Sequence, residues 1–190
     1  MSDRDKKRQR TMSLHEAVKK GDIKDVKTLL SEGANVNEKD GHGWTALHWS
    51  ALKGHADVSK VLIKYGPNVN EKDKYGSAPL HFSAFNGHAD VSKVLLENGA
   101  NVNAVNEIKW KFTPLHRAVY SGHIDVMKLL MMNGANVNAL NTDDQSPLYR
   151  AVGWSPIELR VSTMLELVCS GARIDEKSIS KDESGVLRKV

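Results

Sequence analysis

An internal repeat with a period close to 33 residues constrains this chain more than any other feature. The same pattern begins at five leucines, each followed by His or Tyr: Leu14, Leu47, Leu80, Leu115 and Leu148. The intervals are 33, 33, 35 and 33 residues, and two further markers, Gly-His (or Gly-Asp) and Gly-Ala-Asn-Val-Asn, keep step in most copies. Matching segments at such a period predict an array of stacked units rather than one closed core.

Each unit is expected to contain two short helices joined by a glycine turn, as the third copy illustrates. A first helix is predicted from Pro79 to about Phe85, because Pro fits the first helical turn. Gly87 ends this helix, since Gly readily takes the left-handed backbone conformation. The apolar spacing over 91–96 predicts a second helix that ends before Gly99. One such pair cannot bury its apolar side alone, so neighbouring copies have to stack.

These residues resemble the ankyrin repeat. The resemblance rests on Thr-Pro-Leu-His, Gly-His and Gly-Ala-Asn-Val-Asn, and it covers about residues 13–175. It implies an all-α fold with short β-hairpin tips, in which helix pairs stack into an ankyrin-repeat α-solenoid. We expect an ankyrin-repeat domain over 11–175, with repeats near 11–39, 40–72, 73–105, 106–140 and 141–175. A basic disordered tail is expected over 1–10, and a C-terminal tail or degenerate cap over 176–190.

Two repeats depart from the pattern. The segment 106–112 has two extra residues and carries Ile108, Trp110 and Phe112, which either project as a binding finger or fold back onto neighbouring fingers. The following repeat lacks Gly-His and contains Ser155-Pro156 instead. This dipeptide predicts a helix start and a second helix extended toward its N-terminus. Trp154 is expected to shield the end of the stack.

The net charge of +4 belongs mostly to the ends of the chain. Residues 1–10 carry five basic and two acidic groups, and residues 173–190 carry five and four, so the 17 basic and 17 acidic groups between them cancel. Nucleic-acid binding calls for a basic stripe on the folded part, which the repeats lack, so this partner is not expected. No apolar run approaches the roughly 20 residues that span a bilayer, and no membrane partner is expected.

Catalytic and metal chemistry are not expected either. Seven of the eight histidines recur with the repeat, about one per layer, whereas zinc needs three or four ligands around one point. In the family, the His after Leu bonds loop backbone and ties neighbouring hairpins together. Neither a phosphate-binding glycine loop nor an acid–base pair is found, so we predict no enzyme and no cofactor. The one cysteine, Cys169, is expected to pack internally in a reducing compartment, cytoplasmic or nuclear.

The resemblance implies that another protein binds at the hairpin tips and the concave side of the first helices. Side chains at the corresponding positions form the predicted contact set: His42, Trp44, Leu52, Lys53, Tyr75, Ser77, Phe85, Asn86, Ile108, Trp110, Phe112 and Tyr120. Leu52, Phe85 and Tyr120 share one repeat position, so stacking is expected to align them in an apolar stripe. The alternative is that the rings fill space between repeats. Arg117 and Arg150 make the later repeats more polar.

The leading prediction is a monomeric adaptor or scaffold that recognises a protein. One alternative is the substrate-recognition part of a larger protein such as a ubiquitin ligase, and another is nucleic-acid or nucleotide binding aided by the basic residues 6–10. Some ankyrin repeats are hydroxylated at an asparagine of Asn-Val-Asn, and the matching positions are Asn37, Asn70, Asn103 and Asn138. The family prefers an acidic residue two positions earlier, where this chain has Asn, and this lowers the expectation.

Overall fold

The computed structural model describes residues 12–107, 109–156, 158–182 and 185–188, without the side chain of Trp154. The predicted tail over 1–10 and Ile108 therefore lie outside the described residues. Five consecutive helix pairs follow one another: α2 (Leu14–Lys20) and α3 (Ile23–Ser31), α4 (Ala46–Lys53) and α5 (Ala56–Ile63), α6 (Pro79–Phe85) and α7 (Ala89–Glu97), α8 (Pro114–Ser121) and α9 (Ile124–Met132), α10 (Pro147–Trp154) and α11 (Arg160–Cys169). A last helix, α12 (Glu176–Lys181), follows them.

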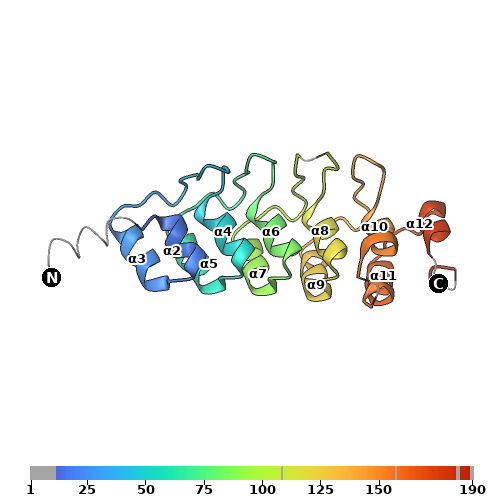
Figure 1. Ribbon diagram of the computed structural model, residues 1–190. Helices are drawn as coiled ribbons and strands as arrows, with labels where there is room; N and C mark the ends of the chain where they lie inside the picture. Colours follow the sequence, from blue (N-terminus) through green and yellow to red (C-terminus); the bar gives the residue numbers. More distant parts are fainter. Residues whose placement is uncertain (1–11, 108, 157, 183–184, 189–190) are drawn as a thin grey trace.

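The pairs stack in chain order into an elongated array (Figure 1). Helices α2, α4, α6, α8 and α10 each contact the next and form an inner row, and α3, α5, α7, α9 and α11 form an outer row. The long loops between pairs, here called fingers, all project from the same side of the array (Figure 1). This arrangement confirms the predicted all-α ankyrin solenoid. No strand occurs among the described residues, and backbone hydrogen bonds such as that from Asp40 N–H to Trp44 O, 2.9 Å, close the fingers instead.

A continuous apolar core runs through the stack at equivalent repeat positions. The leucine that begins each pattern is at most 4% exposed in all five copies. The third and fourth residues after it are Ala, Ser or Val throughout, and they are at most 1% exposed. Their small size lets neighbouring inner helices approach closely, so the core of one unit is completed by the next.

The histidines after Leu47, Leu80 and Leu115 tie each repeat to the following finger. His48, His81 and His116 donate from Nε2 to the carbonyls of Ser77, Phe112 and Gln145, each at 3.1 Å. Their Nδ1 atoms accept a backbone N–H at the start of their own helix. Burial lowers the pKa of His48, and it lowers the pKa of His81 and His116 to about 4. These imidazoles are therefore neutral structural bridges, as the family resemblance implies.

A second set of histidines makes the opposite connection, back to the preceding repeat. His55, His88 and His123 stand before α5, α7 and α9, and their Nε2 atoms bond the carbonyls of Lys19, Leu52 and Phe85 at 3.3, 3.1 and 3.1 Å. The glycine at the equivalent turn of the preceding repeat leaves room for each ring. A Cβ on Gly54, for example, would come within 2.6 Å of the His88 ring, and the φ of this residue is +76°.

The asparagines that end the Asn-Val-Asn segments also join neighbouring repeats. Asn70 Oδ1 accepts the N–H of Asn101 at 2.7 Å, while its Nδ2 donates to the carbonyl of Gly99 at 2.9 Å. Asn103 and Asn138 make the same pair of contacts with the repeats that follow them. These side chains thus have a structural role at the positions where hydroxylation remains a prediction.

The predicted helix start at Ser155-Pro156 is wrong. Helix α10 continues to Trp154, and α11 begins only at Arg160. Ser155 Oγ donates to the carbonyl of Val119 at 2.6 Å, which takes the place of the missing histidine bridge. Because the Ser155 hydroxyl is used between repeats, it does not cap a helix of its own. The proposed shielding role of Trp154 concerns a side chain outside the described part.

The C-terminal segment packs against the last repeat in the part that is described. Helix α12 contacts α10, and Leu187 is only 4% exposed. The N–H of Leu187 donates to Asp182 Oδ2 at 2.7 Å. This packing fits a degenerate cap better than a free tail. Cys169, in contrast, is exposed, so its predicted internal packing is wrong.

Candidate protein-binding surface

The side chain of an aspartate or asparagine at the start of the tip turn holds the shape of each finger. Asp40 Oδ1 accepts the N–H groups of His42 and Trp44 at 2.8 and 3.1 Å, and Asp73 holds its finger in the same way. Asn141 repeats the arrangement. Such side-chain bonds to the backbone two and four residues on are typical of Asp and Asn in tight turns. They hold the finger tips in one conformation, which favours a preformed contact surface.

The second carboxylate oxygens of the first two fingers hold tryptophans. Asp40 Oδ2 accepts Nε1–H of Trp49 at 2.8 Å, and Asp73 Oδ2 accepts Nε1–H of Trp44 at 3.0 Å. Partial burial alone would raise the pKa of Asp40, but the hydrogen bonds from Trp44 and Trp49 outweigh it and lower the pKa. The Trp44 ring also lies 4.6 Å from the rings of Trp49 and Phe82. Trp44 is therefore half-buried and serves packing as well as any contact with a partner.

Phe85 and Tyr120 lie side by side at the ends of α6 and α8. Their rings are stacked, with centroids 6.3 Å apart and an angle of 16° between the planes. They are 39% and 40% exposed, respectively, so both rings offer accessible apolar area after packing on each other. Leu52, at the same repeat position in α4, is half-buried. The predicted alignment of this repeat position thus leads to direct stacking in its last two members.

Two arginines insert between the rings of this region. The Arg117 guanidinium lies 5.6 Å from the centroid of Phe85 and 5.3 Å from that of Phe112. The Arg150 guanidinium lies 4.8 Å from Phe112 and 5.2 Å from Tyr120. We call these five residues the Arg–aromatic cluster. Burial lowers the pKa of Arg117, and the nearby charge of Arg150 lowers it further, while burial also lowers the pKa of Arg150.

The enlarged finger both projects and folds back. Trp110 is 42% exposed, whereas Phe112 is 5% exposed and lies between the two guanidiniums. Neighbouring fingers hold this loop on both sides. The carbonyl of Trp110 accepts the N–H of Thr142 at 3.2 Å, and Glu107 N–H donates to the carbonyl of Tyr75 at 2.8 Å.

The predicted contact residues differ in accessibility. The exposed members are His42, Lys53, Tyr75, Phe85, Trp110 and Tyr120. Trp44, Leu52 and Asn86 are half-buried, while Ser77 and Phe112 are buried and offer a partner little area. Sequence reasoning left Arg117 and Arg150 out of the contact set. Their repeat position could have indicated that they belong to this surface. Both stand two residues after the leucine that begins the pattern, where earlier copies have Trp49 and Phe82.

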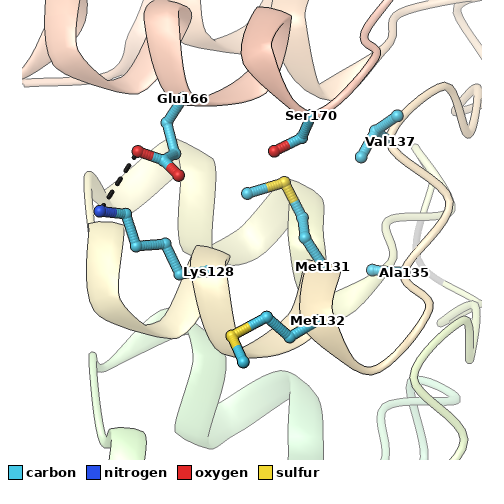
Figure 2. Close-up of a pocket in the computed structure, with 7 residues that line it drawn as sticks. All are labelled: Lys128, Met131, Met132, Ala135, Val137, Glu166 and Ser170. Carbon is cyan, nitrogen blue, oxygen red and sulfur yellow. Dashed lines mark ion pairs between the residues drawn. The ribbon is translucent and has the colours of Figure 1, made fainter.

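An open groove lies elsewhere, between α9 and α11 in the outer row. It has a volume of about 510 Å3 and is lined by Met131 and Met132 together with the ion pair of Lys128 and Glu166, 3.3 Å apart (Figure 2). Figure 2 shows that both methionines come from α9 and that Met131 lies toward Ser170 of the adjacent repeat. No member of the predicted contact set lines this groove.

Within the described ranges, no three His, Cys, Asp or Glu side chains gather where they could hold a metal ion. In the same part of the chain, none of the helices has the length and apolar character needed to cross a membrane.

Comparison with known proteins agrees with the repeat architecture. A family model described as ankyrin repeats in three copies matches residues 14–106, and a single ankyrin-repeat model matches residues 110–142. A search of curated proteins found no match. The matched regions together cover more than half of the 190 residues and include the first four helix pairs. Ankyrin repeats are generally protein–protein interaction modules and typically not enzymes, and this chain belongs to the ankyrin-repeat family.

Proposed function

We propose that the chain is an adaptor or scaffold that binds another protein along its finger tips and inner helices. The Phe85–Tyr120 stack is the observation that carries the proposal. Aromatic side chains dominate many interfaces because they bury a large area with few rotatable bonds. Here two such rings stay about 40% exposed even though they stack on each other. Exposed aromatics on the fingers, Tyr75 and Trp110, extend the same surface.

The rigidity of this surface also supports the proposal. The His123 ring bonds the carbonyl of Phe85, and His116 bonds the next finger, so the segments that carry the aromatic rings are tied to adjacent repeats. A preorganised surface loses less conformational entropy on binding than a flexible one. We therefore expect partner recognition without a large rearrangement of the repeats.

The proposal is tested by replacing both rings in the full chain. Phe85→Ala with Tyr120→Ala removes accessible aromatic area at the ends of two inner helices. A matched control, Tyr65→Ala with Met132→Ala, removes exposed apolar groups at the ends of outer-row helices, just after α5 and at the end of α9, where they are 44% and 85% exposed. Each variant is used for affinity capture with quantitative mass spectrometry, and captured proteins are then purified and tested for direct binding.

Proteins captured by the wild type and the outer-row control but lost by the ring variant would support the proposal. Interface anchors of this kind typically cost at least about 2 kcal/mol when truncated, or roughly 30-fold in affinity. Circular dichroism has to show equal helix content for all three chains. Equal capture by the ring variant, or loss of partners only in the outer-row control, would contradict the proposed surface.

A monomeric state and a cytoplasmic or nuclear location remain part of the proposal. The single, exposed Cys169 favours a reducing compartment.

A further inference from the structure

Charged side chains are distributed unequally between the two rows of helices. The outer row carries six basic and six acidic residues. The inner helices α4, α6, α8 and α10 carry Lys53, Arg117 and Arg150 but no Asp or Glu. The lowered pKa values of His48, His81 and His116 keep the imidazoles of these inner helices neutral at physiological pH. These four inner helices thus carry a net positive charge, whereas the charges of the outer helices balance.

The Arg–aromatic cluster concentrates this charge at one place. The Phe112 ring has the Arg117 guanidinium 5.3 Å from its centroid and the Arg150 guanidinium 4.8 Å away. Phe85 and Tyr120 support the same two guanidiniums from α6 and α8. Rings packed against guanidinium groups restrict their orientation, so less entropy is lost when the planar forks bind an acceptor.

In the part of the chain that the structure describes, the charge of Arg117 is not paired with a carboxylate. Arg117 takes part in none of the ion pairs found among the described residues. Asp73 is the carboxylate that most favours its charged form. Both oxygens of Asp73 are already engaged, by the N–H groups of Tyr75 and Ser77 and by Trp44 Nε1–H. The half-buried Arg117 therefore lies close to a second cation, Arg150, and an external carboxylate would stabilise the charged form of Arg117.

We propose that this surface selects partner segments in which an aspartate or glutamate stands close to an apolar residue. The apolar side chain packs on Phe85 and Tyr120, and the carboxylate accepts hydrogen bonds from Arg117. The inference rests on the proposed function and adds the chemistry of the partner. Nucleic acid fits less well, because phosphate backbones bind along extended basic stripes, whereas only two cations stand in this cluster.

A display library of random twelve-residue peptides, selected on the full chain, provides the probe. We expect enriched peptides to contain Asp or Glu within a few positions of Leu, Ile or Phe. The strongest peptide is then synthesised with Glu→Gln or Asp→Asn at that position. Hydrogen bonds between charged groups contribute enough that neutralisation should weaken binding about tenfold or more in fluorescence anisotropy. Because the protein is unaltered, this comparison does not depend on how a variant folds.

Protein variants locate the contact. Arg117→Gln should lower the affinity for the acidic peptide by a similar factor. The affinity for the neutralised peptide should hardly change, as expected when the arginine and the carboxylate interact directly. The control Lys93→Gln removes one positive charge from the outer row and should leave the affinity for both peptides unchanged. Raising the salt concentration should weaken binding of the acidic peptide more than binding of the neutralised one, because salt screens exposed charge pairs.

The outcomes separate this inference from the proposed function. Uncharged enriched peptides that require Phe85 and Tyr120 but not Arg117 would overturn the acidic preference and leave the binding surface standing. Peptides insensitive to both the ring variant and Arg117→Gln, or no enrichment at all, would refute both. A single-stranded oligonucleotide that binds more tightly than any selected peptide would also overturn the proposal.

Discussion

The buried histidine bridges predict that the solenoid loses stability in mild acid. His81 and His116 each donate from Nε2 to the next finger, while Nδ1 accepts a backbone N–H. A proton added to Nδ1 would face that N–H and break the contact. Burial lowers the folded-state pKa of both to about 4, below the model value of 6.5. As the pH falls, the unfolded chain therefore binds these protons first.

The size of the effect follows from this difference in pKa. Stability due to neutral His81 and His116 is fully present above about pH 6.5 and is lost as the pH falls toward about 4. At pH 5 the linkage relation gives a loss of about 2 kcal/mol for each histidine, or about 4 kcal/mol together. The lowered pKa of His48 acts in the same direction. A loss of this size is a large share of the roughly 5–15 kcal/mol that stabilises a typical protein.

Urea unfolding followed by circular dichroism at pH 7.5 and pH 5.0 measures this loss. The double variant His81→Gln with His116→Gln should start less stable but lose about 4 kcal/mol less between the two pH values. His42→Gln, at an exposed finger tip, should keep the wild-type pH dependence. Equal wild-type stability at both pH values, or the same decrease in the double variant, would refute the assigned role of the histidines.

Three further outcomes are expected in urea titrations. Gly66→Ala should lower the free energy of unfolding by about 1–2 kcal/mol, through the strain of a left-handed backbone alone. Gly54→Ala should lower it further, because the added Cβ would meet the His88 ring at 2.6 Å. Equal losses in the two variants would contradict this explanation. Asn103→Ala should cost about 1–3 kcal/mol because it removes two inter-repeat hydrogen bonds, and an unchanged midpoint would argue against that role. Lys72→Ala breaks an exposed ion pair with Glu107 and should cost less than about 1 kcal/mol, so a larger loss would count against a purely surface role.

The repeat positions of the candidate site were predictable, but the accessibility of its side chains was not. Phe85 and Tyr120 share a repeat position, and stacking brings their rings together as the period predicts. Trp110 and Phe112 are two residues apart in one irregular finger, yet one is 42% exposed and the other 5%. The positive φ of Lys111, 49°, lies between them and turns the chain. A sequence period carries no information about such a local turn.

Ser155 illustrates the same limit. Ser-Pro is a common helix start, and local preference alone favours that interpretation. In the folded chain the Ser155 hydroxyl bonds the carbonyl of Val119 in the preceding repeat, where a histidine serves the earlier copies. The competing partner lies 36 residues away, so only the stacked structure reveals it.

The sequence by itself determined the repeat, the helix pairs and the solenoid, because each recurs at a fixed period and depends on contacts with the nearest copies. The tertiary structure alone decided which groups remain available on the surface. Phe112 became buried because two guanidiniums close over its ring, and Arg117 came to lie between rings from α6 and the third finger. Exposure and charge balance depend on side chains contributed by three adjacent units at once, and a pattern within one unit cannot specify them.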